Sequence, residues 1–87
     1  MTSTYEQRET EALADKMLRG MAAERALADM SGREAIAYAL RKMVGTQADL
    51  ARASGITGTT ISAMKNSARR PNAAQRAALA WAIAKGY

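Results

Sequence analysis

The chain has 87 residues and a net charge of +5, and it contains neither cysteine nor histidine. A chain of this length forms one domain with a thin core, and the missing residue types exclude disulfides, thiolate chemistry and imidazole catalysis or metal binding. Hydrophobic residues make up 48% of the chain, but 21 of them are alanines, which favour closely packed helices. With one proline and few β-branched runs, the sequence predicts an all-α fold, a small bundle of about five helices.

Charge divides the chain into two parts. Residues 1–32 carry four basic and six acidic side chains, a net charge of −2, whereas residues 33–87 carry nine basic and two acidic ones, a net charge of +7. The division predicts an N-terminal element, residues 1–32, followed by a domain that binds a polyanion, residues 33–87. A solvated basic surface without a partner is the alternative.

The N-terminal part predicts one long helix. Ser3 and Glu6 have the spacing of a capping box, so we expect the helix to begin near Thr4 and to continue to about Asp29. Its larger apolar residues recur at helical spacing in a narrow stripe formed by Leu13, Met17, Met21 and Leu27. Because the other faces carry charges of both signs, we expect this stripe to form a homodimer interface. The alternative is that the helix folds back and covers its own domain.

Local capping signals divide the rest of the chain into four more helices. The predicted starts are at Ser31 with Glu34, Thr46 with Asp49, Thr57, and Asn72 with Gln75. The expected helices cover residues 33–44, 47–54 and 58–66, and a last helix runs from Asn72 to Gly86. Gly45 is expected to end the first of them as the C′ residue.

The last helix has two apolar sides. Alanines at helical spacing surround Trp81, so we expect this tryptophan to lie in the core together with Ala74, Ala77 and Ala78. Leu79 and Ile83 face another direction and indicate a second buried surface.

Residues 47–71, QADLARASGITGTTISAMKNSARRP, are expected to form two short helices joined by a tight turn. Gly55 permits a positive φ in the turn, and Ile56 fills the corner. Ile61 and Met64 give the second helix one buried side, while its other side carries only small residues. A short helix with a small polar face and positive charge beyond it fits the DNA major groove. One more alanine-rich helical hairpin is the alternative.

This segment resembles the helix-turn-helix of the Cro/CI-type (XRE) family of phage and bacterial regulators. The matching residues are Gln47, Leu50, Ala51, Gly55, Ile61, Met64, Arg69, Arg70 and Pro71. The resemblance covers about residues 33–85. It departs from the family pattern at Ser54, Lys65 and Ser67, where an apolar residue, an acidic residue and a glycine are usual.

The resemblance implies which residues contact DNA. Base contacts are expected from the second helix, at Gly58, Thr59, Thr60, Ser62 and Ala63. Phosphate contacts are expected from Gln47, Thr57, Lys65, Asn66, Arg69 and Arg70. The base-contact set contains no arginine, asparagine or glutamine, so bidentate recognition of a base is not available and direct readout should be modest.

These expectations describe a sequence-specific transcription regulator that binds double-stranded DNA, a dimeric repressor or an activator that contacts RNA polymerase. An antitoxin or adaptor that binds a protein partner through its N-terminal helix is the alternative. We expect no catalysis, no cofactor and no metal. The sequence contains neither an apolar run of about 18 residues nor a signal-peptide pattern, so we expect a cytoplasmic location. The resemblance implies association with the nucleoid, in a bacterial or phage context.

Overall fold

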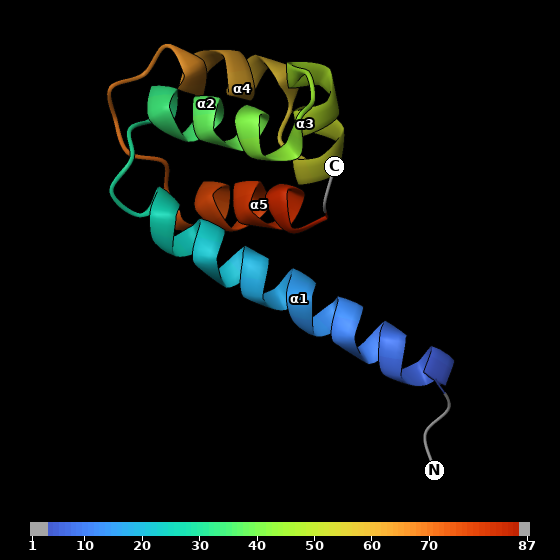
Figure 1. The fold of residues 1–87 in the computed structure, drawn as a ribbon. Helices are drawn as coiled ribbons and strands as arrows, with labels where there is room; N and C mark the ends of the chain where they lie inside the picture. Colours follow the sequence, from blue (N-terminus) through green and yellow to red (C-terminus); the bar gives the residue numbers. More distant parts are fainter. Residues whose placement is uncertain (1–3, 86–87) are drawn as a thin grey trace.

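This computed structural model describes residues 4–85 of the chain. These residues form five α-helices joined by loops and contain no strand (Figure 1). Side chains are described for residues 11–85. The helices are α1 (Thr4–Leu27), α2 (Gly32–Met43), α3 (Gln47–Ser54), α4 (Gly58–Lys65) and α5 (Ala73–Ala84). The predicted all-α bundle with an extra long N-terminal helix is confirmed.

The last helix, α5, lies at the centre of the arrangement. It packs against α1 on one side and against α2 and α3 on the other, while α4 packs against α2 and α3 (Figure 1). The alanines of α5 make this central position possible, because Ala80, Ala82 and Ala84 are buried and allow close approach of the neighbouring helices. As a result, α1 and α4 lie on opposite sides of the bundle (Figure 1).

Helix starts follow the local capping signals. Three capping boxes form, between Ser31 and Glu34, Thr46 and Asp49, and Asn72 and Gln75. In each box the side chain of the N-cap residue accepts a hydrogen bond from a backbone N–H that the helix itself leaves unpaired. Thr57 caps α4 in the same way, by accepting from the N–H of Thr60. The expected box of Ser3 and Glu6 and the expected stop at Gly86 lie outside the described residues.

The end of α2 differs from the sequence expectation. The left-handed conformation falls on Val44, with φ 51° and ψ 53°, and not on Gly45. Gly45 lies close to the start of α3, since a Cβ atom there would lie 3.2 Å from both Cβ and Oδ2 of Asp49. The space at Gly45 is therefore tight, and the preceding β-branched residue, Val44, takes the left-handed backbone conformation.

The core receives at least one wholly buried side chain from every helix. These side chains are Leu27, Ile36, Met43, Leu50, Ile61 and Leu79. Leu27 had been expected in a dimer interface, and this expectation is wrong, because its exposed fraction is 0% within a single chain. Ala23, one turn earlier in α1, is buried as well. The last two turns of α1 thus belong to the same core as the predicted domain of residues 33–87.

The outward face of α5 also corrects an expectation. Trp81, expected in the core, is 62% exposed, and Ala74 and Ala77 are exposed too. The buried side of α5 is the one that carries Leu79 and Ile83. The alanine-rich spacing around Trp81 therefore reflects an outer face of small residues and not a core position.

The N-terminal part of α1 projects away from the other helices (Figure 1). The described molecule accordingly measures 51 × 24 × 19 Å along its principal axes. On the described side chains of this part, Leu13, Met17 and Met21 are each 60–61% exposed. Three of the four predicted interface residues are thus available to another molecule.

Candidate nucleic-acid interface

The turn between α3 and α4 is held by local hydrogen bonds. Gly55 has φ 76°, and its N–H donates to the carbonyl of Ala51 over 2.9 Å. Ser54, one of the departures from the family pattern, donates its hydroxyl to the carbonyl of Leu50 at 2.6 Å and accepts from the N–H of Ile56 at 3.1 Å. A serine hydroxyl can satisfy such backbone groups at a helix end. The two hydrogen bonds of Ser54 connect the end of α3 to the turn that leads into α4.

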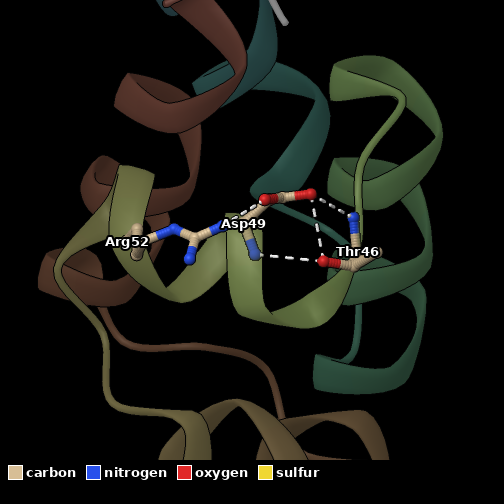
Figure 2. Close-up of polar contacts among 3 residues, drawn as sticks. All are labelled: Thr46, Asp49 and Arg52. Atoms are coloured by element: carbon tan, nitrogen blue, oxygen red, sulfur yellow. Dashed lines mark hydrogen bonds and ion pairs between the residues drawn. The ribbon is translucent and has the colours of Figure 1, made fainter.

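The start of α3 is stabilised by a small polar cluster (Figure 2). The backbone N–H and the hydroxyl of Thr46 both donate to Asp49 Oδ2 over 3.0 Å. Arg52, one turn further along, donates to the other carboxylate oxygen of Asp49. The hydrogen bonds from Thr46, with a smaller contribution from Arg52, lower the pKa of Asp49 below its usual value. The guanidinium group of Arg52 is therefore paired with a carboxylate of its own helix, α3.

The end of α3 is attached to α5. The ammonium group of Lys85 donates to the carbonyl of Ala53 over 2.9 Å. A cation at the C-terminal end of a helix also interacts favourably with the helix dipole. Because Lys85 is 32 residues away in the sequence, no local pattern indicates this contact.

One face of α4 is buried and the opposite face is exposed. Ile61 and Met64 are buried against the rest of the bundle, as predicted. The exposed face carries four of the five expected base-contact residues, Gly58, Thr59, Ser62 and Ala63. No other group approaches within 4 Å of the position that a Cβ atom of Gly58 would occupy. This face therefore offers a smooth surface of small side chains with two hydroxyl groups.

Thr60, the fifth expected base-contact residue, is placed differently. It is half-buried, and its hydroxyl accepts a hydrogen bond from the hydroxyl of Thr57 at 2.9 Å. Thr57 also accepts from the backbone N–H of Thr60 over 3.3 Å. This pair forms the cap of α4, and the structure does not bring Thr60 onto the exposed face with the other four.

The loop that follows α4 is fixed to the start of α2. The N–H groups of Gly32 and Arg33 donate to the carbonyls of Arg69 and Ser67, over 2.7 and 3.1 Å. Gly32 makes this contact possible, because a Cβ atom there would lie 2.5 Å from the carbonyl oxygen of Met64. The sequence pattern does not single out Gly32 for such a contact. Its closeness to α4 depends on a residue 32 positions away, so no local signal reveals it.

Three cations lie at the end of α4 and in the loop that follows it. The side chains of Lys65, Arg69 and Arg70 are exposed, and within the described side chains none of them forms an ion pair. The carboxylate of Glu34 is engaged with Ser31 at the start of α2. The only two acids of the basic part of the chain, Glu34 and Asp49, are therefore committed to capping boxes, and the positive charge beside α4 is not neutralised by either.

The remaining expected phosphate contacts lie at helix ends. Gln47 is the first residue of α3 and is half-buried, and Thr57 is the exposed N-cap of α4. Asn66 is exposed at the end of α4, where its amide donates to the carbonyl of Ser62 over 3.1 Å. Helix N-termini present free N–H groups that attract phosphate oxygens. Gln47 and Thr57 thus lie where such contacts form, whereas one of the two amide N–H donors of Asn66 is already used within α4.

No described helix has the combination of length and apolar character that crossing a membrane requires. Among the described residues, no group of three or more acidic, histidine or cysteine side chains comes together as a metal site would need. Comparisons with protein-family models, with curated proteins and with solved structures find no match for this chain.

Proposed function

We propose that this chain is a DNA-binding transcription regulator of the Cro/CI-type helix-turn-helix class that reads the major groove with α4. One observation carries the proposal. The exposed face of α4 consists of small and hydroxyl side chains, and the cations Lys65, at the end of α4, and Arg69 and Arg70, in the loop after it, form no ion pair among the described side chains. A narrow helix face of this kind can approach base edges closely while nearby cations contact the phosphate backbone.

The two kinds of contact have different tasks. Lys65, Arg69 and Arg70 neutralise phosphates and position the protein, but they carry little sequence information. Thr59 and Ser62 can form hydrogen bonds with several bases, and the methyl group of Ala63 can touch a thymine methyl. Sequence preference is therefore modest for a single copy. Such a protein acts most simply as a repressor that occupies a promoter, and contact with RNA polymerase would make the same module an activator.

Salt dependence tests whether the basic surface is the binding surface. Binding to duplex DNA is measured by fluorescence anisotropy at several salt concentrations. If about 6–10 phosphates are contacted, the slope of log K against log salt is about −5 to −9. A slope shallower than about −2 would contradict the proposal.

Single-residue variants then distinguish residues that contact phosphates from residues that contact bases. Lys65→Ala and Arg70→Ala should weaken binding to all duplexes about equally, whereas Thr59→Ala should change the ranking among sequences by roughly 1–3 kcal/mol at particular base pairs. Arg19→Ala is the matched control, because it removes the same charge from α1, on the other side of the bundle. Equal losses for Arg19→Ala and Arg70→Ala would refute the assignment of the surface.

A protein-binding role, as an antitoxin or adaptor, is the second candidate, and the exposed apolar side chains of α1 favour it. Selection of duplexes from a random pool distinguishes the two functions. A regulator enriches particular sequences at least about a hundredfold over random DNA, whereas an adaptor with a basic surface never exceeds non-specific affinity.

A further inference from the structure

Most of the exposed large apolar side chains of the described chain gather on α1 and α5. Leu13, Met17, Leu18, Met21 and Trp81 are each 60–63% exposed. A groove of about 320 Å³ runs between the two helices. Its walls are formed by Leu13, Met17 and Met21 of α1 and by Trp81 of α5. Its floor is made of small residues, since Gly20 lies opposite Ala84, with a Cβ position 3.5 Å from the alanine Cβ. We call this surface the α1–α5 groove.

We propose that the α1–α5 groove binds the same groove of a second copy of this chain, related by a two-fold axis. The proposal goes beyond DNA binding and does not depend on it. The proposed interface differs from the one expected from the sequence. Leu27 is not part of it, because Leu27 is buried in the core, and Trp81 of α5 is part of it. A two-fold interface uses one surface twice, so that surface must be complementary to itself.

The charges at the edge of the groove have this self-complementarity. Lys16 and Glu24 both line the groove and lie four residues before and four residues after Gly20. They are about 12 Å apart along α1, from the rise of 1.5 Å per residue. When two α1 helices pair antiparallel about Gly20, each Lys16 lies beside the Glu24 of the other copy. Interhelical ion pairs of this type select the partner and its orientation.

The area is compatible with a dimer interface. A large apolar side chain has on the order of 150–250 Å² of surface, so the four that line the groove, each 60–62% exposed, present roughly 500 Å² per copy. This value lies in the upper half of the range for the largest apolar patch on an ordinary monomer, about 300–600 Å². With the two charged side chains at the edge, the surface approaches the roughly 800 Å² per partner of a standard specific interface. The two exposed methionines adapt easily to a facing surface.

Sedimentation of the full chain without DNA tests the proposal. The wild type should show a concentration-dependent monomer–dimer equilibrium, and Met17→Glu should raise the dissociation constant at least about tenfold. Val44→Glu is the matched control, because it places the same charge on another exposed apolar residue, 83% exposed and outside the groove. A wild type that stays monomeric up to millimolar concentration would overturn the proposal and leave the groove to a different protein.

Charge exchange tests the two-fold pairing itself. Lys16→Glu and Glu24→Lys should each weaken the homodimer, since each variant places like charges beside one another. An equimolar mixture of the two variants should associate again, because every pair across the interface is then of opposite sign. The double variant should likewise dimerise as the wild type does. Failure of both the mixture and the double variant to associate would overturn the antiparallel arrangement, whatever the DNA measurements give.

Discussion

Gly32→Ala should destabilise the protein strongly, although alanine is normally the better helix former. Gly32 is the first residue of α2 and is buried where this helix crosses the end of α4. The new Cβ atom would lie 2.5 Å from the carbonyl oxygen of Met64, 3.2 Å from its carbonyl carbon and 3.3 Å from its Cα atom. All three are backbone atoms that no rotamer change can move. Relief of the clash therefore requires α2 and α4 to separate.

The cost follows from this separation. Overpacking of this kind costs about 1–3 kcal/mol. A shift of about 1 Å would also stretch the hydrogen bond from Gly32 to Arg69, 2.7 Å long, whose net contribution is about 0.5–1.5 kcal/mol. The helix preference of alanine returns about 0.5–1 kcal/mol. The three terms combine to a net loss of about 0.5–4 kcal/mol, and the central value of about 2 kcal/mol lowers Tm by roughly 8–16 °C for a domain of this size.

Thermal and urea unfolding followed by circular dichroism measure this loss. Gly58→Ala is the matched control, since Gly58 is also the first residue of a helix but has open space at its Cβ position. Its stability should stay the same or rise by up to about 1 kcal/mol. If Gly32→Ala melts at or above the wild-type temperature, the close crossing of α2 and α4 is wrong, and with it the placement of the loop that carries Arg69.

Three further predictions concern stability. Leu27→Ala should cost about 2–5 kcal/mol in urea unfolding, because Leu27 is wholly buried; a stable fragment lacking residues 1–30 would contradict this. Val44→Gly should raise Tm, since it removes about 1–2 kcal/mol of left-handed strain at an exposed residue, whereas Gly55→Ala, at φ 76°, should lower it. Hydrogen bonds from Thr46 are the main cause of the lowered pKa of Asp49. The ionised carboxylate therefore stabilises the fold fully above the ordinary pKa of about 3.9, and this stabilisation is lost as the pH falls through the lowered value. Asp49→Asn should remove this part of the pH dependence of urea unfolding.

The sequence by itself determined the features that depend on neighbours along the chain. Three capping boxes, the cap at Thr57 and the left-handed Gly55 all appear where the local pattern predicts them. The groups involved are at most four residues apart, and their hydrogen bonds form within one turn of backbone. The same holds for the exposed face of α4, because Ile61 and Met64 define the buried side and helical geometry places the small residues opposite.

Only the tertiary structure decided which helix sides meet. The stripe of α1 is continuous in the sequence, but its last member, Leu27, lies in the core while Met17 lines the α1–α5 groove and is 61% exposed. Trp81 faces outward although its helix is the central one. Alanine is compatible with either side of a helix, so an alanine-rich pattern leaves the buried side undetermined. Which side of a helix is buried depends on residues that are distant in the sequence, and these become neighbours only once the helices have packed. Gly32, which lies against the backbone of Met64, is an example.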